Sequence, residues 1–220
     1  MSEYRVFIGY DPRQPIAYNV AQYSVARNAS KPVSVTPLIL PQLPITRRGL
    51  TEFTFSRFLV PYLCDFRGRA MFMDPDMIVA GDVCELIDSI DPTDGSVFVV
   101  KDQPDFERPS MMVFSNPKCR YLTPEYVQNE ENVLFDFDWA LNVGELPPEW
   151  NHCVGYQEPK KAKLYHYTCG LPIWPEVNDL FDENRVWDDE FRQSVSSVGW
   201  SELMGGSVHA EHLRKLRANN

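Results

Sequence analysis

The sequence predicts a single α/β domain, built on a mostly parallel central sheet with helices on its faces. One observation is the uninterrupted apolar run at residues 70–73, which is typical of a strand buried on both faces. Another is the opening of the chain, where an apolar run at 6–8, a helical pattern from Pro15 and a run at 33–40 form a strand–helix–strand unit. The length of 220 residues suits one domain with a sizeable core.

The later elements follow from the same patterns. Residues 54–63 predict a helix that Pro61 weakens in its last turn, and 83–90 predict a short helix with Asp82 as its N-cap. Further strands are expected at 77–80, 97–100, 111–114 and 162–165, an irregular region at 117–160, and helices beyond Pro175 and at 208–217. We expect a nucleotide-binding half at about 1–90, an acceptor half at about 91–175 and a helical tail at about 176–220.

Composition narrows the class of partner. The formal net charge of −10 argues against a nucleic-acid backbone or an anionic membrane surface as the main partner. No apolar run is long enough for a membrane span, and no basic-then-apolar signal region precedes the first strand. Five cysteines without a C-x-x-C pair predict reduced thiols. We therefore expect a soluble, cytoplasmic protein.

Two carboxylates emerge where the buried run at 70–73 ends. Asp74 and Asp76 are separated only by Pro75, which has no backbone N–H to donate. Unpaired charges at such a place are costly, and a divalent cation bound by carboxylate oxygens would compensate them. The alternative is an ordinary polar turn, because Asp and Pro are common turn residues. His166 follows the last expected strand, and it is either a third metal ligand or a hydrogen-bonded structural residue.

Ligands of open α/β sheets bind beyond the carboxyl ends of the strands. Gly9, Tyr10 and Asp11 end the first strand there, beside the two carboxylates and His166. Two carboxylates and an imidazole can bind Mn²⁺ or Mg²⁺ and leave positions open for diphosphate oxygens. Gly170 would let backbone N–H groups approach a phosphate closely.

Four segments together resemble the nucleotide-sugar glycosyltransferases of the GT-A type, family 8 and its small bacterial and phage relatives. They are RVFIGYDPRQ, FTFSRFLVPYL with RAMFMDPDMIVAGDVCELI, GELPPEWNHCVGY, and KAKLYHYTCGLPIW, and they span nearly the whole chain. The resemblance implies that Asp74 and Asp76 are the D-x-D metal ligands and His166 is the third. It also implies that Arg57 contacts the nucleotide sugar.

The same resemblance assigns Gly9, Tyr10 and Asp11 to the base and ribose. Ser110 and Asp138 fall where the family holds the donor sugar, and Asp138 is the nearest candidate for a catalytic carboxylate. The chain departs from the glycogenin-like pattern, because Leu171 stands after Gly170 where a lysine is expected. Neutralising the diphosphate would then depend on the metal, Arg57 and one of two adjacent arginines, Arg47 and Arg48.

The sequence thus predicts a metal-dependent enzyme that transfers a sugar from a nucleoside diphosphate sugar, UDP being the expected nucleotide, to an acceptor hydroxyl. The resemblance implies retention of configuration, by double displacement or by front-face attack. A sugar nucleotidyltransferase is an alternative, although residues 9–15 lack its Gly-rich, Lys/Arg-bearing phosphate loop. A further alternative is a nucleotide-sugar binding module without catalytic activity, against which the acidic pair and His166 argue.

Overall fold

The computed structural model describes residues 4–102, 105–174, 176–195 and 215. Its central sheet has six strands in the order β2-β1-β3-β6-β5-β7, which confirms the expected α/β class. These strands are β1 (Tyr4–Gly9), β2 (Val33–Leu38), β3 (Arg69–Met73), β5 (Val97–Val99), β6 (Met111–Ser115) and β7 (Val143–Glu145). Three of the five pairings are parallel, and β6 pairs antiparallel with both β3 and β5.

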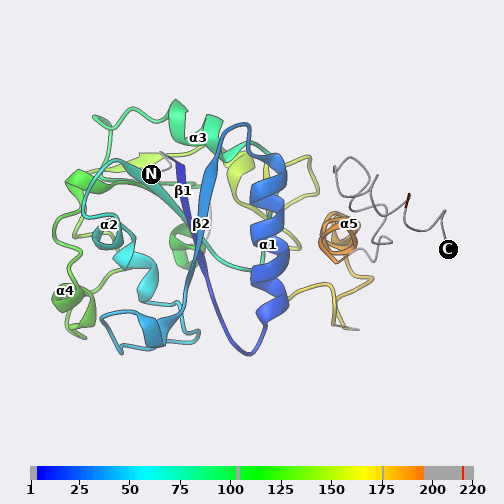
Figure 1. Cartoon of the computed structure of the whole chain (residues 1–220), viewed down its shortest axis with the longest axis horizontal. Helices are drawn as coiled ribbons and strands as arrows, with labels where there is room; N and C mark the ends of the chain where they lie inside the picture. Colours follow the sequence, from blue (N-terminus) through cyan, green and yellow to red (C-terminus); the bar gives the residue numbers. More distant parts are fainter. Residues whose placement is uncertain (1–3, 103–104, 175, 196–214, 216–220) are drawn as a thin grey trace.

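Short helices flank this sheet. The α-helices are α1 (Pro15–Asn28), α2 (Val60–Leu63), α3 (Val83–Ser89), α4 (Pro124–Gln128) and α5 (Asn184–Ser194), and 3₁₀ turns include η2 (Ser56–Leu59) and η3 (Asp105–Ser110). In Figure 1, α1 lies on one side of β1 and β2, α2 and α4 lie on the other, and α5 lies beyond α1. Among the described helices, none combines the length and the apolar character needed to cross a membrane.

Side chains of the central strands alternate between the two faces of the sheet, so the core has two layers. Met71 and Met73 of β3 pack in the cluster that contains Tyr18 of α1, whereas Phe72 packs on the opposite face with Phe58. Because successive side chains of a strand point to opposite faces, a fully apolar strand needs a covering layer on each side. The uninterrupted apolar run of residues 70–73 is explained in this way.

A second sheet was not expected from the sequence. It has three strands in the order β4-β9-β8, with bounds Met77–Val79 (β4), Leu164–His166 (β9) and His152–Cys153 (β8). The strand expected at 162–165 is therefore displaced by two residues at its start. It pairs with β4 and β8 rather than extending the central sheet. Two strands that were expected in the central sheet, β4 and β9, therefore belong to the second sheet.

Two other expectations need correction. The helix expected over residues 54–63 is the 3₁₀ turn η2 followed by a single α-helical turn, α2. Pro61 lies in the first turn of α2. Backbone N–H groups there have no intrahelical partner, so a proline costs no hydrogen bond. The region 117–160, expected to be irregular, contains α4, β7 and β8. Of the helix expected at 208–217, only Lys215 lies within the described residues.

Candidate metal and donor site

The strand order brings the expected site residues to one edge of the central sheet. β1 and β3 are parallel neighbours, with Ile8 beside Met73, so their carboxyl ends adjoin. The chain continues from β1 into α1 and β2 on one side, while β3 lies on the other, which makes this edge a crevice of the kind that binds ligands in open α/β folds. β6 runs antiparallel to β3, and therefore begins at the same edge.

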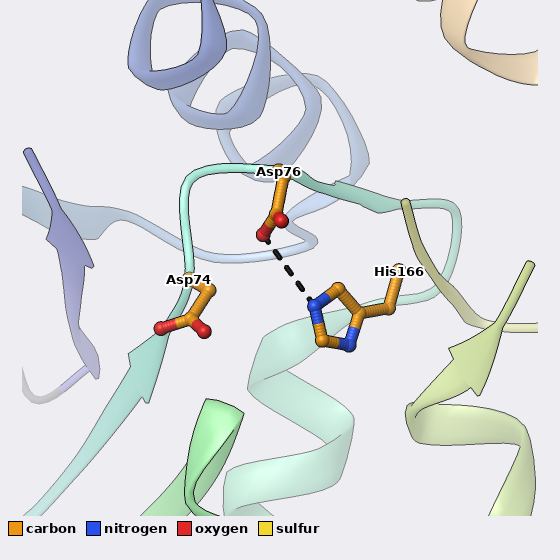
Figure 2. A group of neighbouring side chains, drawn as sticks. All are labelled: Asp74, Asp76 and His166. Carbon is orange, nitrogen blue, oxygen red and sulfur yellow. Dashed lines mark ion pairs between the residues drawn. The ribbon is translucent and has the colours of Figure 1, made fainter. Parts of the chain in front are cut away.

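The small sheet adds the histidine. Met77 of β4 is paired with His166 of β9, and the Tyr167 N–H donates to the Asp76 carbonyl oxygen at 2.9 Å. These backbone contacts place the imidazole beside the carboxylates although some ninety residues separate them along the chain. Figure 2 shows Asp74, Asp76 and His166 directed toward one another. One ligand atom from each residue lies within 4.8 Å of the others.

Arg57 joins this group from η2. Its Nη2 lies 3.1 Å from Asp74 Oδ1, and its Nη1 donates to the Pro109 carbonyl oxygen at 2.8 Å. The guanidinium also lies against the ring of Phe72, 5.0 Å from the ring centroid. Arg57 is only 6% exposed, so its charge is buried together with that of Asp74. The structure therefore excludes a solvated surface arginine at this position.

Burial gives the two carboxyl groups different protonation behaviour. It raises the pKa of Asp74 to about 7, since the favourable charge of Arg57 offsets burial only in part. Burial also acts to raise the pKa of Asp76, but the contact with His166 outweighs it and leaves that pKa below its ordinary value. For His166, burial acts to lower the pKa, yet Asp76 and Glu107 hold it well above 6.5. Asp76 and His166 thus stabilise each other's charged forms, whereas burial disfavours the ionised form of Asp74.

The donor set fits a divalent cation. Among the described residues, Asp74 Oδ1 and Asp76 Oδ1 are buried without a hydrogen-bond partner, although each lies near a positive or ionisable group. Unsatisfied buried carboxylate oxygens are costly, and hard divalent cations take such oxygens as ligands. The Asp76 side chain retains 32% exposure, which leaves this side of the group accessible from solvent. Mn²⁺ and Mg²⁺ both suit two carboxylates and one imidazole.

Ser110 lies at this site, and Gly170 lies in the turn that follows β9. The Asp74 N–H donates to the Ser110 carbonyl oxygen at 2.9 Å, because Ser110 directly precedes β6. Gly170 has φ of +113°, a backbone conformation that side-chain-bearing residues rarely adopt. Its N–H donates to the Tyr167 carbonyl oxygen at 2.9 Å. A contact of this particular N–H with phosphate would require that bond to open.

The end of β1 forms a separate hollow beside this group. Tyr10 lines a cavity of about 300 Å³ with mostly apolar residues from the end of β2, and Arg48 and Glu52 complete its wall. Gly9 is required by close packing, because a Cβ there would lie 2.5 Å from the ring of Phe53. Asp11 is held by Arg13 at 2.6 Å, which keeps the pKa of Asp11 below its ordinary value.

The remaining expected residues lie apart from the three candidate ligands. Asp138 is exposed in the segment between α4 and β7, next to Trp139, which is buried against Phe58 and Phe114. No hydrogen bond or ion pair joins Asp138 to the candidate ligands within the described part of the chain, and its catalytic role stays a prediction. Arg47 is committed elsewhere, since its Nη1 donates to the Asn129 carbonyl oxygen at 2.8 Å.

No sequence pattern indicated the polar side chains around His166 Nδ1, of which Asn151 and Glu107 lie nearest. Asn151 Oδ1 lies 3.1 Å from His166 Nδ1, and Glu107 Oε2 lies 3.5 Å from the same nitrogen. Both side chains are buried, Asn151 completely and Glu107 at 5% exposure. Asn151 immediately precedes β8, which pairs with β9. No local pattern marks either residue, because their proximity to His166 arises from pairings between distant segments.

Comparison with solved structures identifies the class of fold. The glycosyltransferase GlyE of Streptococcus pneumoniae TIGR4 superimposes with a TM-score of 0.61 over 85% of this chain, at 16% identity. An active-site mutant of LgtC superimposes with the same TM-score of 0.61 over 88% of this chain and 97% of LgtC, at 9% identity. The chain spans 59% of the length of GlyE. At these identities the similarity establishes the fold alone, which is that of the GT-A glycosyltransferases.

Sequence comparison assigns the chain to a family. Protein CDI of Arabidopsis thaliana is 33% identical over 213 residues, covering 80% of this chain and 82% of the plant protein. The chain therefore belongs to the same family as Protein CDI. No protein-family model matches the sequence. A further LgtC structure, with a TM-score of 0.57 and 10% identity, is a complex with donor and acceptor sugar analogues.

Proposed function

We propose that the protein is a metal-dependent glycosyltransferase that moves a sugar from a nucleoside diphosphate sugar to an acceptor hydroxyl. The observation that carries the proposal is the group of Asp74, Asp76 and His166, whose ligand atoms lie within 4.8 Å of one another at the carboxyl edge of the sheet. Open α/β sheets bind ligands beyond the carboxyl ends of their strands, which supports a donor at this edge. The LgtC complex with donor and acceptor sugar analogues supports a sugar donor and a sugar acceptor.

Asp74, Asp76 and His166 would hold Mn²⁺ or Mg²⁺, and the bound cation would stabilise the negative charge that develops on the departing diphosphate. Arg57 keeps Asp74 oriented through its ion pair and its bond to Pro109. The His166 Nδ1 is occupied by Asn151, so Nε2 is the nitrogen that faces Asp76 and the cation. Because His166 must lose a proton to bind a metal, cation binding should release protons.

The cavity beside Tyr10 is the proposed position of the nucleobase. Its volume of about 300 Å³ and its apolar lining suit a planar ring, and Glu52 Oε2 is a buried acceptor without a hydrogen-bond partner in the described chain. Arg48 lies beside it, with Nη1 3.3 Å from Glu52 Oε1. Uracil presents an N–H between two carbonyl groups, which matches an acceptor next to a guanidinium. We therefore propose UDP as the nucleotide.

The proposed reaction proceeds with retention of configuration, as expected from the resemblance to family 8. Asp138 would serve as the catalytic carboxylate only if its exposed segment approaches the donor sugar. Front-face attack needs no such approach, because an oxygen of the leaving phosphate takes the proton of the acceptor. Substitution of Asp138 by Asn separates these routes, since only the first requires the carboxylate.

A thermal-shift panel of nucleotide sugars, with and without Mn²⁺, tests the proposal. We expect stabilisation by one UDP-sugar that depends on Mn²⁺, followed by release of free sugar and UDP on prolonged incubation. Release of pyrophosphate from a nucleoside triphosphate and a sugar phosphate would instead indicate a nucleotidyltransferase. Binding of a nucleotide sugar without hydrolysis or transfer to any acceptor would indicate a binding module. Either result would overturn the proposed activity.

A further inference from the structure

Glu107 is a charged side chain buried on the far side of His166 from the carboxylate pair. It lies in η3, the turn that leads into β6, and it is 5% exposed. Its Oε1 accepts a hydrogen bond from the Thr168 hydroxyl, and its Oε2 lies 3.5 Å from His166 Nδ1. Burying a carboxylate costs stability unless its charge is compensated by nearby groups. The groups that surround Glu107 are those around His166.

The backbone of Glu107 organises the groups around His166. Its carbonyl oxygen accepts from the Ser110 hydroxyl at 2.5 Å and from Asn151 Nδ2 at 3.3 Å. Asn151 Nδ2 also donates to Ser110 Oγ at 3.2 Å, so the amide nitrogen of Asn151 faces two acceptors. Its Oδ1 is thereby turned toward His166 Nδ1, which must carry a proton to donate to it. The Nε2 lone pair of a neutral His166 then faces Asp76.

When His166 is neutral, as a metal ligand must be, the carboxylates around it outnumber the positive charges. Asp74, Asp76 and Glu107 contribute three negative charges, and Arg57 contributes one positive charge. With His166 as a neutral ligand, two negative charges remain, which a divalent cation would neutralise. Glu107 supplies one of these two charges without being placed as a ligand, because it contacts His166 at the nitrogen that faces away from Asp76.

We propose that Glu107 is a positioning residue for the metal-binding histidine. Its carbonyl oxygen holds Asn151, which accepts the Nδ1–H of His166, and its carboxylate, 3.5 Å from Nδ1, supplies negative charge that favours a divalent cation. The inference rests on the proposed metal site. A carboxylate at the second nitrogen of a ligand histidine fixes the ring and increases its basicity, and loss of such a partner typically costs about 10- to 100-fold in metal affinity. The interaction also links η3 to the segment after β9 through Thr168.

Substitution of Glu107 by Gln tests the charge with little change in size. Mn²⁺ binding to the metal-free protein is measured by titration, and its melting temperature by scanning fluorimetry. We expect Glu107→Gln to bind Mn²⁺ about 10- to 100-fold more weakly than wild type. The melting temperature of the metal-free protein should fall only slightly, because Gln keeps an acceptor for Thr168 but loses the charge near His166. A purely structural role would lower the melting temperature and leave the Mn²⁺ affinity at the wild-type level.

Two further variants complete the test. Glu107→Asp keeps the charge on a shorter side chain and should retain more Mn²⁺ affinity than Glu107→Gln. Glu145→Gln removes an equal charge from an exposed position on β7 and should bind Mn²⁺ as wild type does. Wild-type Mn²⁺ affinity in Glu107→Gln would overturn the role of Glu107 alone, as would equal losses in Glu107→Gln and Glu107→Asp. Failure of the wild-type protein to bind Mn²⁺ would overturn both this inference and the proposed function.

Discussion

Replacing Arg57 by Lys separates the shape of this side chain from its charge. The lysine ammonium would still oppose Asp74, so no buried carboxylate loses its counter-charge. It lacks the planar fork that reaches Pro109 and Asp74 together, at 2.8 Å and 3.1 Å. Losing one hydrogen bond from a charged donor costs about 1.5–3 kcal/mol. For a protein of this size, that corresponds to a fall of roughly 3–12 °C in melting temperature.

The same substitution should weaken use of the donor. Arg57 orients Asp74, and through it one proposed ligand of the cation, so a misplaced Asp74 would reduce cation-dependent donor binding. If the loss equals that of the charged hydrogen bond, donor kcat/KM falls by roughly 10- to 150-fold. Melting curves of the metal-free protein and steady-state donor kinetics with Mn²⁺ measure the two effects separately.

Arg47→Lys is the matched control. Arg47 donates to the Asn129 carbonyl oxygen at 2.8 Å and lies 3.9 Å from the centre of the Phe55 ring, so its loss should also lower the melting temperature. It has no contact with the candidate ligands among the described residues, and donor kinetics should stay at the wild-type level. The reasoning is refuted if Arg57→Lys keeps wild-type kinetics, or if both variants lose donor activity to the same extent.

Three other substitutions or treatments give distinct outcomes. Gly9→Ala would place a Cβ 2.5 Å from the Phe53 ring. We therefore expect urea denaturation to show a loss of about 1–3 kcal/mol in the unfolding free energy. Wild-type stability would contradict the close packing. Arg27→Met would leave the buried Glu190 carboxylate without its 2.5 Å partner on α1, and should lower the melting temperature more than Arg67→Met, which removes an exposed ion pair. Alkylation of the native protein should modify Cys169 first, because it is exposed while Cys64, Cys84, Cys119 and Cys153 are buried, and burial raises the pKa of Cys119 to about 12. Mass spectrometry should show five modified thiols only after denaturation, and rapid native modification of all five would be inconsistent with the described core.

The elements that sequence periodicity predicted well are those governed by local pattern. The apolar run at residues 70–73 is β3, and Asp82 caps α3 by accepting a hydrogen bond from the Cys84 N–H at 2.9 Å. The carboxylate pair at the end of β3 was recognisable because charges seldom follow a fully buried strand without a compensating partner. Such features depend on a few adjacent residues, and a single sequence contains them.

The features that escaped prediction depend on pairing between distant segments. Periodicity indicated a strand near residues 162–165 but not that β9 would pair with β4, and this pairing is what brings His166 to Asp76. Glu107 and Asn151 reach His166 from two further segments, and no spacing rule connects them. The ion pair of Arg57 with Asp74 likewise arises only when the fold brings η2 close to the end of β3.

The most direct test of the metal-dependent donor site is calorimetric titration of Mn²⁺ into the wild-type protein and the Asp76→Asn variant, each with UDP present. Asp76→Asn removes a proposed ligand without removing core volume. Because contact with His166 keeps the pKa of Asp76 below its ordinary value, loss of this charge should lower the metal-free melting temperature, and the titration is made below that temperature, where the variant is folded. We expect the wild-type protein to bind one Mn²⁺ together with UDP and to release protons on binding. We expect the heat of Mn²⁺ binding to be absent in Asp76→Asn. Mn²⁺ binding of equal affinity in a folded Asp76→Asn variant would contradict this expectation.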